Sequence, residues 1–221
     1  MIRDLLWALR WLRRNPLFTI AITVILALGI GANTAVFSIV DAVLLRPLPY
    51  ESAARLAGIQ AKSTKNPTVG ISGREYLLWR DHMDAFERTV SCLKDVVTLT
   101  GAGEPDQVTA LRASAGLFSL LGARARLGRT LVDADHAPNA PNAAVLSDRL
   151  WRRRFHADPG AIGRTVTGSG EVFTIVGVMP PEFEFLVSNI EMWIPLHLHP
   201  ASTNFVQVLG RLKKGISLAQ A

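Results

Sequence analysis

Residues 15–40 read NPLFTIAITVILALGIGANTAVFSIV and contain no charged side chain. Most of these residues are Ile, Leu, Val, Ala or Phe. As a helix, the 26 residues would extend roughly 39 Å at about 1.5 Å per residue, whereas the hydrocarbon core of a bilayer is about 30 Å thick. The stretch therefore predicts a membrane-spanning helix, which we assign to residues 15–45.

A cleaved signal peptide is the alternative interpretation of this segment, since it also follows basic residues. Its apolar region is usually about 7–15 residues long and is followed by a small-residue cleavage site of the A-x-A type. No A-x-A pattern follows the run. Both its length and its exit therefore favour an uncleaved anchor.

The charges that flank the span predict its orientation. Arg3, Arg10, Arg13 and Arg14 precede it, opposed only by Asp4. Cytoplasmic flanks carry an excess of Lys and Arg, so we expect the N-terminus in the cytoplasm and the remaining chain outside. The basic residues after the span lead into a segment longer than the roughly 60 residues over which loop charge governs topology.

Residues 1–14 have two interpretations, and the sequence does not decide between them. Apolar side chains recur at helical spacing, with Trp7 and Trp11 one turn apart and arginines beside them. This pattern is typical of an amphipathic helix on the inner leaflet. It is equally typical of the basic flank of a membrane anchor.

Small side chains occupy every fourth position of the predicted span: Thr19, Thr23, Ala27, Gly31 and Ala35. In lipid, helices associate through close packing and short hydrogen bonds, and faces of small residues permit that approach. We therefore predict a helix-packing face there. Its partner would be a helix of another chain or a further membrane-spanning helix of a longer protein.

The composition excludes two classes of protein. The chain has 221 residues, of which 49% are hydrophobic and 19% charged, which excludes a disordered chain. Cys92 is the single cysteine, which excludes a disulfide scaffold. The formal charge of +6 is compatible with an anionic partner.

Residues 46–221 have the pattern of a mixed α+β domain. The turn signals and alternation predict strands at 56–61, 90–100, 107–114, 143–146, 165–167, 172–179, 191–196 and 204–212. Ser72 and Glu75 form a capping box that predicts a helix with Tyr76, Trp79, Met83 and Phe86 on its buried face. Further helices are expected at 117–121, after Ser147, and from Ser217. Because a helix from Ser217 would stop after one turn, we expect the chain to be a fragment.

The sequence offers no residues for catalysis, for a cofactor or for a metal. It lacks a G-x-x-x-x-G-K-[ST] loop, so this chain has no ATP-binding P-loop of its own. His197 and His199 lie two apart, but a third ligand is missing and a strand end is favoured. Asp133, Asp135 and His136 lack the calcium-loop pattern and predict a solvated loop. We therefore expect no enzyme; a membrane-anchored hydrolase would need a nucleophile and a base that cannot be assembled here.

Two groups of arginines would suit an anionic partner: Arg124, Arg126 and Arg129, then Arg149, Arg152, Arg153 and Arg154. The predicted topology separates them from nucleic acids, which excludes that partner. Trp151 and Phe155 fit the buried side of a helix whose other side is solvated. Binding to lipid headgroups or to a partner protein stays open.

Several segments, taken together and in order, resemble the MacB-like ABC transporter permeases. Residues 29–38 (GIGANTAVFS) and 44–50 (LLRPLPY) are similar to the first span and its exit in these permeases, particularly the large permeases of Acidobacteria. The segments at 127–130, 145–147, 151–155, 158–159, 162–164, 176–180 and 193–196 are similar to the periplasmic core domain. His156 and Ala157 depart from the pattern, since such sequences often have glycines there.

The resemblance implies an α+β domain, residues 46–221, on the outer face of the bacterial cytoplasmic membrane, between a first span and three later ones. It implies a non-catalytic permease subunit, of the MacB or FtsX kind, that couples ATP-driven motion to export or to mechanical transmission. Its partners would be an ABC ATPase, further permease spans and membrane lipid. The alternative is a single-span membrane-anchored module that binds or interacts outside the cell, without a transporter.

Overall fold

The computed structural model describes residues 14–40, 50, 52–61, 70–101, 104–185 and 189–221. The chain divides into two compact units, Met1–Leu48 and Pro49–Ala221. The predicted leaflet helix at 1–14, apart from Arg14, and the exit from the span at 41–49 lie outside the described residues.

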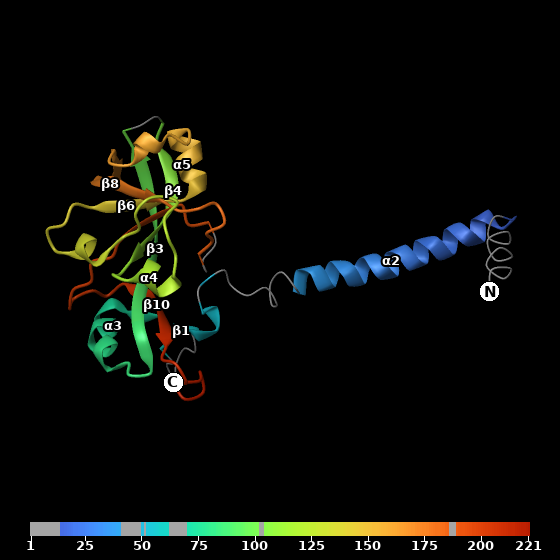
Figure 1. Ribbon diagram of the computed structural model, residues 1–221, viewed down its shortest axis with the longest axis horizontal. Coiled ribbons are helices and arrows are strands. Elements are labelled where there is room, and N and C mark those ends of the chain that lie inside the picture. The colour runs from blue at the N-terminus through green and yellow to red at the C-terminus, as the bar shows by residue number, and fades with distance from the viewer. Residues whose placement is uncertain (1–13, 41–49, 51, 62–69, 102–103, 186–188) are drawn as a thin grey trace. The chain divides into compact units, whose positions relative to one another are not determined.

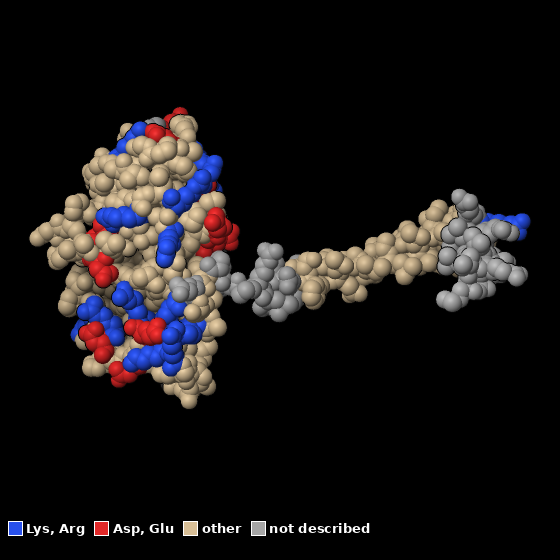
Figure 2. Space-filling view, in the orientation of Figure 1, with Lys and Arg blue, Asp and Glu red and all other residues tan. Residues whose placement is uncertain are grey.

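The first unit contains α2, Pro16–Val40, as an uninterrupted helix of 25 residues. Residues 16–38 have a mean hydropathy of 2.1 and are long and apolar enough to cross a membrane. The helix has no charged residue, as its uniform tan surface in Figure 2 shows. Pro16 is tolerated because an N–H group in the first turn of a helix has no acceptor within the helix, so the N–H that proline lacks is not needed.

The second unit is built on one large mixed sheet with short helices packed on it (Figure 1). Its strands are β1 Leu56–Ile59, β2 Ile71–Ser72, β3 Phe86–Thr100, β4 Asp106–Ala113, β5 Leu127–Gly128, β6 Ala143–Leu146, β7 Thr165–Gly168, β8 Glu171–Val178, β9 Met192–Pro195 and β10 Phe205–Leu212. Its α-helices are α3 Gly73–Trp79, α4 Leu117–Leu121 and α5 Asp148–Phe155, with 3₁₀ turns at Ala53–Arg55, Arg80–His82, Asp133–His136 and Pro159–Ala161. The expected α+β class is confirmed.

Part of this sheet, formed by β3, β4, β9, β6, β8 and β7, closes on itself as a small barrel. The sheet order is β1-β10-β3-β4-β9-β6-β8-β5, and β7 pairs with both β3 and β8. The ring β3-β4-β9-β6-β8-β7 is therefore complete. Closure depends on two residue pairs between β3 and β7, Leu99 with Gly168 and Thr100 with Thr167.

Alternation along the strands sorts apolar side chains into three cores. One fills the barrel and is covered at one end by Leu150, Trp151 and Phe155 of α5. A second lies on the opposite face of the sheet beneath α4. The third lies under α3, where Tyr76 packs on β10. Because β3 contributes to all three, this strand of 15 residues joins the parts of the domain.

A bulge in β8 lets the barrel meet β5. The register of β6 against β8 shifts between Ala144 and Val145, which moves Val178 to the interior side. A Cβ on Gly177 would lie 2.0 Å from the carbonyl oxygen of Arg129. Only glycine permits this approach of two backbones.

Most predicted elements are confirmed, including the antiparallel pair β3–β4 and the hairpin β7–β8. The capping box is present: Ser72 Oγ accepts from the N–H of Glu75, whose carboxylate accepts from the N–H of Ser72 at 2.9 Å. Ser147 Oγ likewise accepts from the N–H of Leu150 and begins α5.

One predicted helix is shorter than expected. The helix with Phe86 on its buried face ends earlier: α3 stops at Trp79, which is 41% exposed, and Phe86 begins β3. Phe86 instead packs on the Cα of Gly210, where a side chain would overlap its ring. From Ser217 the structure has a single turn, as predicted: the N–H of Ala221 donates to the carbonyl of Ser217 at 3.2 Å, and the N–H of Ser217 donates to the amide oxygen of Gln220 at 3.0 Å.

Candidate functional site

The predicted packing face lies on the surface of α2. Thr23, Ala27, Gly31 and Ala35 are exposed and Thr19 is partly so. A Cβ added at Gly31 would meet nothing within 4 Å, so the fold of this unit does not require glycine there. The hydroxyl of Thr23 donates to the carbonyl of Thr19 at 2.7 Å, and that of Thr19 donates to Asn15 at 3.0 Å. These donors are thus already satisfied within the helix.

Tyr50 fixes the beginning of the second unit in an aromatic cluster. Its ring lies 6.3 Å from that of Phe183, which in turn lies 5.5 Å from that of Trp193 in β9. The Tyr50 hydroxyl donates to the carbonyl of Glu184. Burial, with the charge of Glu184, raises the pKa of Tyr50 to about 12. The beginning of the second unit is therefore held against the wall of the barrel.

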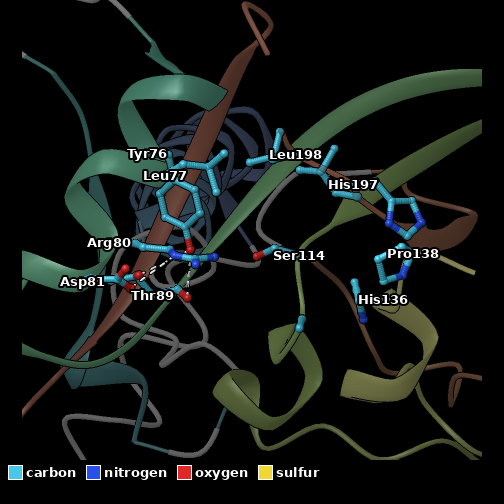
Figure 3. A pocket seen from close by; sticks show the side chains of 12 residues that line it. Tyr76, Leu77, Arg80, Asp81, Thr89, Ser114, His136, Pro138, His197 and Leu198 are labelled. Carbon is cyan, nitrogen blue, oxygen red and sulfur yellow. Dashed lines mark hydrogen bonds and ion pairs between the residues drawn. The ribbon is translucent and has the colours of Figure 1, made fainter. Parts of the chain in front are cut away.

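One cavity of about 640 Å³ lies beside α3 (Figure 3). Its polar lining is largely satisfied by the protein itself. Tyr76 donates to the carbonyl of Thr89 at 3.1 Å, and Arg80 pairs with Asp81 at 3.2 Å. The ring nitrogens of His136 face the carbonyls of Val132 and Ala113 at 3.1 and 3.0 Å. Few groups are left to select a ligand.

A second cavity, of about 570 Å³, lies at the end of the barrel away from α5; we call it the barrel mouth. Its lining comprises Leu93, Asp95, Arg112, Asn142, Glu171, Phe173, Pro195, Leu196, His197 and Asn204. The position follows from strand direction: α5 contacts the first residue of β4, Asp106, whereas Arg112 is near the last.

The polar groups of the barrel mouth are less engaged. Arg112 Nε donates to Asp95 at 2.8 Å, but its Nη2 is 3.6 Å from Glu171, beyond hydrogen-bond distance. The side chains of Asn142, Asn204 and His197 make no hydrogen bond to any described residue. Mouths of β-barrels are common ligand sites.

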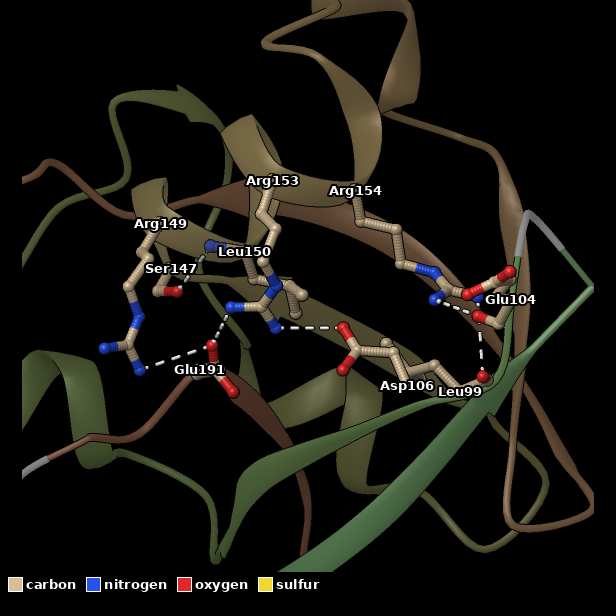
Figure 4. Close-up of polar contacts among 9 residues, drawn as sticks. All are labelled: Leu99, Glu104, Asp106, Ser147, Arg149, Leu150, Arg153, Arg154 and Glu191. Atoms are coloured by element: carbon tan, nitrogen blue, oxygen red, sulfur yellow. Dashed lines mark hydrogen bonds and ion pairs between the residues drawn. The ribbon is translucent and has the colours of Figure 1, made fainter.

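Two arginines of α5, Arg149 and Arg153, are tied to acidic side chains at the barrel end (Figure 4). Glu191, whose side chain is 8% exposed, receives Arg153 at 2.5 Å and Arg149 at 3.2 Å. Arg153 also reaches Asp106 at 2.9 Å. These contacts fasten the helix that closes the barrel, a structural role that we did not predict.

A second group of arginines has the same structural use. Arg126 and Arg152 both pair with Asp148, at 3.0 and 2.6 Å, and both lie over the ring of Trp151. The predicted buried positions of Trp151 and Phe155 are confirmed.

The structure corrects the prediction that the acidic loop is solvated. Asp135 is buried and receives both guanidinium nitrogens of Arg129, at 2.6 and 2.8 Å. Burial raises the pKa of this carboxyl, but the hydrogen bonds from Arg129 and from the N–H of Val132 outweigh it and hold the pKa below its usual range. The loop is therefore an anchored 3₁₀ turn.

The histidine pair lies just beyond a strand end and is exposed, as expected. His197 and His199 follow the last residue of β9, Pro195, so strand alternation does not align them. The Nδ1 of His199 accepts from the N–H of Ala201 at 3.2 Å. Among the residues that the structure describes, no three His, Cys, Asp or Glu side chains are grouped as a metal site requires.

The protein is therefore an α+β domain with a short closed barrel, preceded by an apolar helix of membrane-spanning length. Residues 19–221 match the MacB-like periplasmic core domain. The chain belongs to this family, and the resemblance seen in its sequence is confirmed. No curated protein has significant sequence similarity to it.

Three solved structures share the fold. The extracellular domain of the noncanonic ABC-type transporter YknZ from Gram-positive bacteria is 17% identical with a TM-score of 0.52, over 72% of this chain and 83% of that one. The periplasmic region of MacB from Actinobacillus actinomycetemcomitans is 12% identical with a TM-score of 0.55, over 74% and 76%. A domain of a permease-like protein from Porphyromonas gingivalis is 17% identical with a TM-score of 0.59, over 76% and 79%. Family and neighbours indicate the periplasmic domain of an ABC transporter permease.

Proposed function

We propose that this chain is a non-catalytic permease component that couples ATP-driven motion in the membrane to a domain outside it. The observation that carries the proposal is the span of the family match, residues 19–221, which takes in most of α2 and the whole sheet domain. Membrane helix and outer domain thus belong to one family unit. The ATP would be hydrolysed by a separate subunit or domain, in the cytoplasm.

The structure of the outer domain suits transmission of movement. Tyr50 is held in the aromatic cluster with Phe183 and Trp193, and Trp193 lies in a barrel strand. From there β3 continues through all three cores over roughly 50 Å, at about 3.3 Å per residue. Close-packed interiors transmit strain rather than absorb it. A pull on the segment before Tyr50 would therefore reach the whole sheet.

On this proposal, the small face of α2 contacts another permease helix or a second copy, and the N-terminus lies in the cytoplasm. Gly31 and Gly29 provide a matched pair for the test, because a Cβ added at either would meet no atom within 4 Å. Two residues apart, they lie about 200° apart around the helix, on opposite faces.

The test is co-purification of the full chain from its own membranes, with ATP hydrolysis measured in lipid nanodiscs. We expect ATPase activity to accompany the wild-type chain and the Gly29→Leu variant, and to be lost with Gly31→Leu. Tyr50→Ala should retain the ATPase but lose transport-dependent stimulation of it. Absence of ATPase from the wild-type preparation would refute the permease assignment; equal loss from both glycine variants would refute the packing face alone.

A further inference from the structure

The barrel mouth has an unequal balance of charge. Asp95 and Glu171 carry two negative charges, and Arg112 supplies one positive charge between them. Arg112 is committed to Asp95, whose other oxygen accepts from the N–H of Val96 at 2.8 Å. Among the described residues, the side chain of Glu171 is approached by one cation, Arg112 at 3.6 Å, and it is 47% exposed. A carboxylate is therefore available for a second cation.

The remaining lining suits a cation on a polypeptide. Phe173 and Pro195 are buried apolar side chains that can receive a methylene stem, as the stems of Lys and Arg pack on apolar surface. Asn142 and Asn204 offer both donors and acceptors that no described residue uses, which suits a peptide backbone. The cavity beside α3 lacks this feature, because its polar groups are mostly paired with one another.

We infer that the barrel mouth is a docking site for an Arg or Lys side chain of a partner polypeptide, which binds Glu171 and competes there with the protein's own Arg112. Arg112 shows that the mouth accommodates a guanidinium between its two carboxylates. The site includes no residue of the aromatic cluster at Tyr50.

The test is calorimetric titration of the full chain, in nanodiscs of zwitterionic lipid, with a capped Gly-Arg-Gly peptide. The same peptide with citrulline is its uncharged match, and agmatine represents a small cation without a backbone. We expect binding of the arginine peptide at least about tenfold tighter than that of either control. Equal binding of agmatine would refute the inference that the site binds a polypeptide. Equal binding of the citrulline peptide would refute the inference that the site selects a positive charge.

Two substitutions separate this site from general charge attraction. Glu171→Gln should weaken the arginine peptide about tenfold, whereas Arg112→Gln should strengthen it, because the internal competitor is gone. Glu182→Gln removes an exposed carboxylate outside the mouth and should change nothing. Thermal unfolding of each variant shows that it is folded. Weaker binding after Arg112→Gln in a folded protein would overturn the proposal.

Discussion

Glu191 provides the sharpest test of how the barrel is closed. Its side chain is 8% exposed and is held by Arg149 and Arg153, which link α5 to the strand that follows Glu191, β9. Glu191→Gln keeps the size of the side chain and one acceptor oxygen but removes its charge. The effect of this substitution therefore reports on the ion pairs rather than on a cavity.

The size of the effect follows from the exposure of the partners. Loss of one member of a buried ion pair costs about 3–5 kcal/mol when the other is left buried. Arg149 and Arg153 are 58% and 43% exposed, and Arg153 keeps Asp106. Water can solvate them, so the loss is nearer that of a hydrogen bond to a charged group, about 2 kcal/mol. For a chain of this size this lowers the unfolding midpoint by about 4–8 °C.

The assay is thermal unfolding followed by circular dichroism, on the full chain in detergent at neutral pH. Glu182→Gln is the control, since Glu182 is exposed and has no ion pair with any described residue. Arg153→Ala should destabilise more than Arg149→Ala, because Arg153 contacts two acidic residues. A change below about 0.5 kcal/mol for Glu191→Gln, the usual range of a neutral surface substitution, would refute the reasoning.

Three further predictions concern other parts of the domain. Gly177→Ala should destabilise by about 3 kcal/mol or more in the same assay, because its Cβ would overlap the carbonyl of Arg129, whereas Gly58→Ala has open space and should be nearly neutral. Asp135 has a pKa below its usual range in the folded state, so its contribution is present at neutral pH and is lost as pH falls through that folded pKa; Asp135→Asn should flatten the fall of the unfolding midpoint below about pH 5, and a parallel pH curve would contradict this. Burial raises the pKa of Cys92 to about 12, so iodoacetamide should label it only in denaturant; rapid labelling of the native protein would show that this core opens.

Cys92 protected in this way also makes the predicted orientation testable. A membrane-impermeant maleimide added to cells without an outer barrier should label Glu182→Cys, which is exposed, and not Ala8→Cys. Labelling of Ala8→Cys alone would reverse the topology. Wild-type cells provide the background.

The sequence predicted what local chemistry determines. The apolar run of α2, the capping box at Ser72 and the turn at Gly170 each depend on a few neighbouring residues. Helical spacing was misleading at Phe86, because an i, i+3, i+7 pattern arises by chance in a short segment. In the fold the ring packs on Gly210, which is distant in the sequence. Periodicity carries no information about that distant partner.

The barrel and its mouth could not be predicted for the same reason. Closure depends on only two residue pairs, one of which joins Leu99 to Gly168. No local pattern encodes so distant a contact. Glu191 left a weak signal: an acid directly before a fully apolar strand, with arginines four apart at 149 and 153 on one helix. The pairing becomes recognisable only when the helix and strand are placed together.

The position of β10 has a consequence for biosynthesis. This strand, Phe205–Leu212, pairs with β1, β2 and β3, all of which precede it by more than 100 residues. Until residue 212 has been made and exported, these early strands lack this neighbour, whereas all strands of the barrel are already present. Exposed strand edges invite pairing with other chains. Substitutions in β10 should therefore lower the yield of folded protein even where they change its free energy of unfolding little.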